Sequence, residues 1–327
     1  MNPIAITIGD PAGIGPEVMA KVLADVKPQT PWVLVGTRWS LEVGAQAVGT
    51  TLPDIPTITD VADAREGVSL YDVGLACPDD FVHGQVQAAC GEIAVHSVEW
   101  AAKQCLAENL SAMVTCPLNK EAIHAAGYVN DLGHQEILAR LSGASWTATM
   151  LMTPGLRVAH LSTHKSLIEA ARYVQRDTVL EKLTLVHETV AQWGIDKPRI
   201  AVAALNPHGG EGGLLGREEI EELGPAVADA QAQGIAAVGP IPADSVFTRA
   251  IDGEFDVVLA LYHDQGHIAI KVHNFHESTT ATLGIPFVRT SVDHGTAFDI
   301  AGKGVANPQG LVAAIQMAED IVAGKLK

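Results

Sequence analysis

The sequence predicts an α/β protein of two domains, with largely parallel sheets flanked by helices. Segments with helical spacing of apolar residues alternate with short apolar runs along the whole chain. The chain has 327 residues, which is more than one typical hydrophobic core accommodates. No flexible linker, repeat or low-complexity tract interrupts it, so we expect domains joined by continuous or crossing elements.

The expected strands are short apolar runs, most of which end in polar or glycine-rich residues. They are 4–10, 32–36, 112–120, 156–164, 199–210 and 256–264. The expected helices carry apolar residues three or four positions apart, and Pro16 suits the first turn of the first helix. They are 16–26, 86–109, 177–193, 217–234 and 307–324.

Composition excludes some partners. The formal net charge is -17, which argues against nucleic acid and against an anionic membrane surface. A small anion could still bind in a local basic pocket. The sequence shows no signal-peptide pattern and no run of about 18 apolar residues, so we expect a cytoplasmic protein with no membrane partner. The cysteines show no metal-binding spacing and are expected to be reduced thiols: Cys77, Cys90, Cys105 and Cys116.

Three apolar runs end within a few residues of a histidine: His164, His208 and His263. In open α/β sheets, ligands bind beyond the carboxyl ends of the strands. Three neutral imidazoles at that edge could bind one divalent cation such as Zn²⁺, Co²⁺ or Ni²⁺ and leave a position open for a substrate. Each histidine taken alone could equally be a polar loop residue, so a shared metal site is a hypothesis about the set.

Basic residues are scarce, and two of them, Lys271 and Arg289, flank the last of these histidines along the chain. They suit an anionic substrate, although solvated or ion-paired side chains are an equal alternative from sequence alone. The loop 293–310 is rich in glycine and short polar side chains and suits a polar ligand. The glycines of 9–17 are spaced G-x-x-x-G-x-G, which is a weak match to the dinucleotide pattern G-x-G-x-x-G.

Six segments together resemble the 4-hydroxythreonine-4-phosphate dehydrogenase family over nearly the whole chain. They are TIGDPAGIGPE, NKEAIHAAG, GHQE, NPHGGEGGLLGREE, YHDQGH and RTSVDHGTAFDIAGKG. The last segment is also similar to the adenine-binding loop of the isocitrate and isopropylmalate dehydrogenases, whose nucleotide site is not of the Rossmann type.

The resemblance implies a fold like that of isocitrate and isopropylmalate dehydrogenases, with the active site in an interdomain cleft. Residues 1–130 and 285–327 would form the nucleotide-side domain, and residues 131–284 the metal, substrate and dimerisation domain. It further implies NAD or NADP, a divalent metal (Zn, Co or Mg), and a homodimer whose active site is shared between chains. The implied metal ligands are His164, His208 and His263, one of them supplied by the partner chain.

The resemblance also assigns residues to the substrate, the cofactor and proton transfer. Substrate-binding positions are His134, Gln135, Lys271, Thr280 and Arg289. Cofactor-binding positions are His294, Gly295, Thr296, Ala297, Asp299 and Asn307. Asp244 matches a family active-site aspartate, and Asp244 and Lys120 are the candidates for the acid and the base. Gln135 and Thr280 depart from the family pattern, where we expect Thr and Asn respectively.

The implied reaction is NAD(P)-dependent oxidation of a 3-hydroxy acid followed by decarboxylation. The first expectation for the substrate is 4-hydroxythreonine 4-phosphate, in pyridoxal phosphate biosynthesis. The alternatives within the family are a threonate or erythronate 4-phosphate and a cis-dihydrodiol of an aromatic carboxylic acid. Two more distant alternatives are a metallohydrolase, which would leave the loop 293–310 without a function, and a non-catalytic sugar-acid binding protein, which would produce no NADH.

Overall fold

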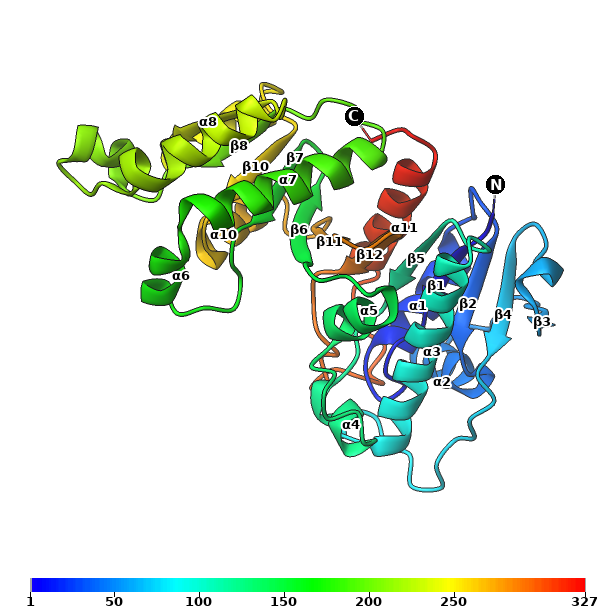
Figure 1. The fold of residues 1–327 in the computed structure, drawn as a ribbon. Helices are drawn as coiled ribbons and strands as arrows, with labels where there is room; N and C mark the ends of the chain where they lie inside the picture. Colours follow the sequence, from blue (N-terminus) through cyan, green and yellow to red (C-terminus); the bar gives the residue numbers. More distant parts are fainter. Residues whose placement is uncertain (1, 327) are drawn as a thin grey trace. The chain divides into compact units, whose positions relative to one another are not determined.

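The computed structural model describes residues 2–326, and the chain divides into two compact units. Unit 1 runs up to Thr147 and includes Ile285–Ala323, and unit 2 comprises Ala148–Gly284 and the residues from Gly324 on (Figure 1). The first crossing lies at 147 rather than at 130, where the sequence led us to expect it. Helix α5 (His134–Ser142) packs on α3 (Ala88–Leu106), so residues 131–147 belong to unit 1 by their contacts.

Unit 1 contains a parallel sheet. Its strand order is β3-β4-β2-β1-β5-β12, and every neighbouring pair is parallel. The strands are β1 (Ile4–Thr7), β2 (Trp32–Gly36), β3 (Thr57–Ile58), β4 (Val68–Asp72), β5 (Ala112–Thr115) and β12 (Val288–Val292). Parallel sheets are covered by helices on both faces, and their strands read as continuous apolar runs. That is why the runs at 4–10, 32–36 and 112–120 were recognisable in the sequence.

The alternating residues of β1 enter two hydrophobic cores. Ile4 and Ile6 pack on the side that also holds residues of α1 (Gly15–Asp25) and α11 (Gln309–Val322). Ala5 faces the core that α3 covers. Helix α2 (Arg38–Val48) packs on α1, and α4 (Lys120–Ala125) packs on α3. The expected helices 16–26, 86–109 and 307–324 are thereby confirmed to within three residues at each end.

Unit 2 contains a mixed sheet. Its strand order is β11-β6-β7-β10-β8-β9, in which β7, β10, β8 and β9 run parallel. The strands β11-β6 and β6-β7 pair antiparallel, an exception to the parallel arrangement we expected. The strands are β6 (Ala148–Thr153), β7 (Leu156–His160), β8 (Ile200–Ala203), β9 (Ala237–Ile241), β10 (Val257–Ala260) and β11 (Thr279–Leu283).

The helices of unit 2 are α6 (Leu167–Tyr173), α7 (Arg176–Gln192), α8 (Gly224–Ala232), α9 (Ala243–Ile251) and α10 (His263–His273). The expected helix 217–234 is present as a π-helical turn, Glu219–Leu223, that continues directly into α8. Pro225 lies in the first turn of α8, and its missing backbone donor accords with the wider π-helical turn before it. Across residues 2–326, no helix is long and apolar enough to cross a membrane.

Candidate functional site

The three predicted metal ligands follow three neighbouring strands of unit 2. His164 lies in the loop after β7, His208 follows β8, and His263 is the first residue of α10, just after β10. Strand β10 pairs in parallel with both β7 and β8, so the carboxyl ends of all three strands lie at one edge of the sheet. Residues that follow these three strands therefore lie at the edge of the sheet where open α/β sheets bind ligands.

One chain does not assemble these histidines into a metal site. All three side chains are exposed, and within residues 2–326 no three His, Cys, Asp or Glu side chains converge as a group that could hold an ion. The resemblance implies that one ligand comes from the partner chain. The three-histidine site is therefore still a prediction about the dimer.

Two of the three histidines already have one ring nitrogen paired. Nδ1 of His208 lies 2.7 Å from Oε1 of Glu211, and Nδ1 of His263 lies 2.6 Å from Oδ1 of Asp264. An ionised carboxylate can only accept, so a neutral imidazole in this geometry carries its proton on Nδ1 and its lone pair on Nε2. Such rings are chemically suited to bind a divalent cation through Nε2.

A second group of histidines lies beside His263. The rings of His263 and His267 stack with centroids 3.6 Å apart, and Nδ1 of His267 lies 3.1 Å from Nε2 of the buried His160. Burial, followed by the neighbouring His267 and His263, lowers the pKa of His160 to about 3. The helical spacing of His263 and His267 was the available signal, but the sequence did not reveal that α10 begins at His263.

Unit 1 holds two of the predicted substrate residues close together. Arg289, on β12, is only 5% exposed, and its Nη2 donates to Oγ1 of Thr115 at 2.6 Å. Burial lowers the pKa of Arg289 to about 9. Burial and then the charge of Arg289 lower the pKa of His134 well below its ordinary value. Nε2 of His134 is buried and has no hydrogen-bond partner within residues 2–326. A buried cation beside an unused imidazole nitrogen is suited to an incoming anion.

The other predicted substrate and proton-transfer residues lie on several elements. Gln135 follows His134 on α5, and Lys120 begins α4 in the same unit. In unit 2, Thr280 lies on β11, and the ammonium of Lys271 on α10 lies 5.0 Å from the ring of Phe275. Asp244 is exposed in the first turn of α9.

The predicted cofactor residues all lie on the loop between β12 and α11. The carbonyl of Thr296 accepts from the Ile14 backbone at 3.0 Å, and the non-glycine Ala297 has a φ of 44°. Nδ1 of His294 lies 3.0 Å from the carbonyl of Gly295, and the carbonyl of Asp299 accepts from Lys303. Asn307 accepts from the backbone of Gln309 at 2.9 Å. This loop therefore has a defined shape that is fixed partly by the glycine segment 9–17.

Helix α1 holds this loop through two charged residues that sequence reasoning missed. The buried Glu17 accepts from the backbone of Ala306 at 2.7 Å. Nζ of Lys21 donates to the carbonyls of Gly304 at 2.9 Å and Ala306 at 2.6 Å. Their i, i+4 spacing was the signal, but an exposed ion pair on one helix has the same pattern.

Asp10, immediately after β1, is a fully buried carboxyl. Its Oδ1 accepts from the backbone of Ala12 at 2.8 Å, and its Oδ2 has no partner among the described residues. Burial raises its pKa to about 6, against the lowering effect of backbone donors at Ala12 and Asn119. From sequence, the segment 9–17 could be either a tight turn or a loop that approaches a ligand, and Asp10 was not singled out.

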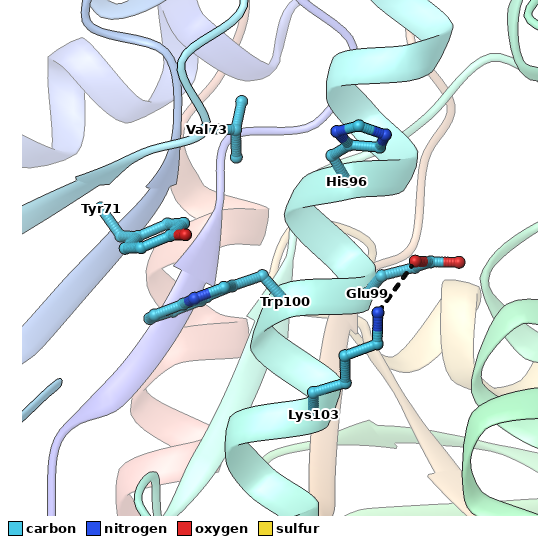
Figure 2. A pocket seen from close by; sticks show the side chains of 6 residues that line it. All are labelled: Tyr71, Val73, His96, Glu99, Trp100 and Lys103. Carbon is cyan, nitrogen blue, oxygen red and sulfur yellow. Dashed lines mark hydrogen bonds and ion pairs between the residues drawn. The ribbon is translucent and has the colours of Figure 1, made fainter. Parts of the chain in front are cut away.

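A surface pocket of unit 1 lies apart from all of these residues. It measures about 360 Å³ and is lined by Tyr71, Val73, His96, Glu99, Trp100 and Lys103 (Figure 2). Tyr71 and Trp100 stack with centroids 3.9 Å apart, and Lys103 pairs with Glu99 at 3.2 Å. Glu99 and Lys103 both lie on α3, and none of the lining residues is a predicted site residue.

Comparisons with known proteins agree with the resemblance. Residues 28–318 match the family model described as pyridoxal phosphate biosynthetic protein PdxA. The chain is 42% identical to the D-threonate 4-phosphate dehydrogenase of Salmonella typhimurium, covering 96% of this chain and 97% of the relative. It is 40% identical to the 4-hydroxythreonine-4-phosphate dehydrogenase of Geobacter metallireducens, covering 97% and 95%. A crystal structure of 4-hydroxythreonine-4-phosphate dehydrogenase from Klebsiella pneumoniae superposes with a TM-score of 0.91 at 38% identity, covering 98% of both chains.

Proposed function

Because the chain belongs to the family of the pyridoxal phosphate biosynthetic protein PdxA, a family of dehydrogenases, we propose that it oxidises a four-carbon 3-hydroxy acid 4-phosphate. In this proposal NAD⁺ or NADP⁺ accepts a hydride from C3, and the hydroxyl proton leaves to a base. The resulting 3-keto acid loses CO₂, and the carbon that carried the carboxylate takes up a proton. The first candidate substrate is 4-hydroxythreonine 4-phosphate.

The buried pair of His134 and Arg289 is the observation that carries the proposal. Arg289 stays positively charged at neutral pH despite its burial, because its pKa is lowered only to about 9. A phosphate bound to its guanidinium would receive charge-assisted hydrogen bonds in a site with little water. Gln135, Lys271 and Thr280 are the other predicted substrate residues, and their side chains would be further donors.

His164, His208 and His263 would hold the divalent cation, with one of them supplied by the partner subunit. Bound there, a divalent metal acts as a Lewis acid that favours ionisation of an alcohol and polarises a carbonyl. Asp244 and Lys120 are the candidates for taking up and returning the protons. The carboxylate of Asp244 and the amine of Lys120 are both groups that general acid–base catalysis uses.

The loop 293–307 would bind the cofactor through its exposed positions. His294, Gly295, Asp299 and Asn307 are exposed, whereas Thr296 is held against the glycine segment 9–17. A loop fixed in this way can bind NAD or NADP with less loss of conformational entropy.

A homodimer accords with apolar side chains that unit 2 leaves in solvent. Leu214 is 85% exposed, Val272 is 83% exposed, and Phe275, three residues after Val272, is 64% exposed. Apolar side chains that gather into one large exposed patch mark surfaces that bind another protein. We infer a second copy of this chain as that partner.

D-threonate 4-phosphate is the second candidate substrate, because Gln135 and Thr280 depart from the pattern of the family and leave the choice within it open. The two substrates differ at C2, which carries an amino group in 4-hydroxythreonine 4-phosphate and a hydroxyl group in threonate 4-phosphate. Gln135 and Thr280 stand where the family pattern has Thr and Asn. A relative named for D-threonate 4-phosphate is 42% identical to this chain.

A substrate panel tests the proposal. The purified protein, loaded with a divalent metal, is mixed with NAD⁺ or NADP⁺ and one acid, and the absorbance of the reduced nicotinamide is followed. The acids are 4-hydroxythreonine 4-phosphate, D-threonate 4-phosphate, D-erythronate 4-phosphate, the corresponding acids without phosphate, and a cis-dihydrodiol of an aromatic carboxylic acid. We expect turnover of a 4-phosphate only. Turnover of the dihydrodiol alone would contradict the role of Arg289 as a phosphate ligand.

A further inference from the structure

The segment that carries His208 has an unusual backbone. Residues 208–213 all have positive φ, and the two that are not glycine are His208 (φ 52°, ψ 26°) and Glu211 (φ 49°, ψ 45°). Glycine adopts this left-handed region freely, whereas another residue there costs about 1–2 kcal/mol. The strain therefore falls on the histidine and on the glutamate three residues later, and strain of this kind is concentrated at functional sites.

A buried carboxylate fixes the start of this turn. Glu219 is only 5% exposed and accepts from the backbones of Leu205 at 2.9 Å and Asn206 at 2.7 Å. Its other oxygen accepts from the side chain of Asn206 at 2.9 Å. A Cβ on Gly210 would lie 2.8 Å from that same oxygen, so only glycine fits where the turn passes over Glu219. The backbone that leads into His208 is thus held by a satisfied network.

The left-handed turn brings the Glu211 carboxylate back to the His208 ring. The distance of 2.7 Å between Nδ1 and Oε1 is that of a charge-assisted hydrogen bond. The pair fixes both the tautomer of the ring and its rotation about the Cβ–Cγ bond. Nε2 is then left as the only ring nitrogen with a lone pair. His263 and Asp264 form a pair of the same chemistry, so two of the three histidines have a carboxylate oxygen beside Nδ1.

We propose that Glu211 is a positioning residue that holds His208 with Nε2 presented to a divalent cation, and that the left-handed turn exists to make this contact. This inference rests on the metal site of the proposed function. Glu211 itself does not touch the cation or the substrate. Glu219 holds the turn from the protein interior, and Glu211 holds the ring from the solvent side.

The test uses the full-length protein and two variants, Glu211→Ala and Glu211→Gln. Glu221→Gln is the matched control, since Glu221 is an exposed carboxylate of the nearby π-helical turn Glu219–Leu223 that pairs with Arg217 and not with a histidine. The dissociation constant of Co²⁺ is measured by competition with a coloured chelator. We expect it to rise 10- to 100-fold in Glu211→Ala, as is typical when a carboxylate behind a ligand histidine is lost. Glu211→Gln, which keeps an accepting oxygen, should lose less, and Glu221→Gln should match the original protein.

A second readout needs no metal. In protein labelled with ¹⁵N-histidine and stripped of metal, long-range ¹H–¹⁵N spectra report which ring nitrogen of His208 carries the proton, with His208→Asn used for assignment. We expect the proton on Nδ1 in the original protein and a shift towards Nε2 in Glu211→Ala. A proton on Nε2 in the original protein, or a Co²⁺ dissociation constant that Glu211→Ala leaves unchanged, would overturn this inference without contradicting the proposed function. If the original protein binds no Co²⁺ although its His208 carries the proton on Nδ1, the proposed metal site is wrong.

Discussion

The His134 imidazole and the Arg289 guanidinium occupy one buried region of unit 1, where the positive charge of the arginine adds to burial in keeping the histidine neutral. The pair is therefore one charged donor beside one neutral ring, rather than two cations that repel each other. An anion that enters this region meets a single positive charge and can also use the unbonded Nε2 of His134.

Arg289→Lys should raise KM for the phosphorylated substrate about 10- to 100-fold, because a lysine ammonium cannot reproduce two parallel guanidinium hydrogen bonds and such bonds contribute about 1.5–3 kcal/mol. The turnover number should change less, since the phosphate takes no part in the bonds that are formed and broken. Arg249→Lys, at an exposed arginine paired with Glu254, is the control. Steady-state kinetics with each variant measure the effect, and an unchanged KM in Arg289→Lys would show that the phosphate binds elsewhere.

Glu17→Ala should raise KM for the nicotinamide cofactor about 10-fold while leaving KM for the acid close to its original value. The substitution leaves the buried backbone N–H of Ala306 without its acceptor, which costs about 1–3 kcal/mol and loosens the loop 293–307. Glu17→Gln keeps an accepting oxygen and should show a smaller effect. Glu42→Ala, at an exposed position of α2, is the control. Equal increases in both KM values would argue against a specific effect on the cofactor loop.

Asp10→Asn should change how stability depends on pH. The folded-state pKa of Asp10 is raised to about 6 from 3.8, so the folded protein binds more protons than the unfolded chain between these values. This carboxyl therefore stabilises the fold at low pH, and that contribution is lost as the pH rises towards 6. Relative to Asp10→Asn, the original protein should lose about 2 kcal/mol of unfolding free energy between pH 4.5 and pH 7.5. Urea unfolding of both proteins at the two pH values measures this. A difference that is independent of pH would mean that Asp10 has an ordinary pKa.

The parts of the fold that could be predicted from sequence are those with a one-dimensional signal. Strand β2 forms over the expected residues 32–36, and α7 lies within one residue of the expected 177–193, because burial on both faces and helical periodicity leave clear patterns. The antiparallel strand β6 was missed, although it forms a hairpin with the neighbouring β7, and its other partner, β11, is distant in sequence. The expected strand 156–164 ends at His160, where the chain leaves the sheet towards His164.

The candidate site shows the same division. That His164, His208 and His263 follow strands was visible in the sequence, and the parallel order β7-β10-β8 confirms that these strands are neighbours. Local partners such as Glu211 and Glu219 could not be predicted. Their roles depend on a left-handed turn and on burial, and neither has a pattern in the sequence that separates it from an ordinary glycine-rich loop.

Metal removal and add-back test the central claim most directly. The protein is dialysed against EDTA and then freed of chelator. Reduction of NAD⁺ or NADP⁺ by the substrate that the panel identifies is then followed without metal and after addition of Zn²⁺, Co²⁺ or Mg²⁺ in turn. We predict that the metal-free protein is inactive and that at least one cation restores activity, while His208→Asn is not restored. Full activity in metal-free protein would contradict the account.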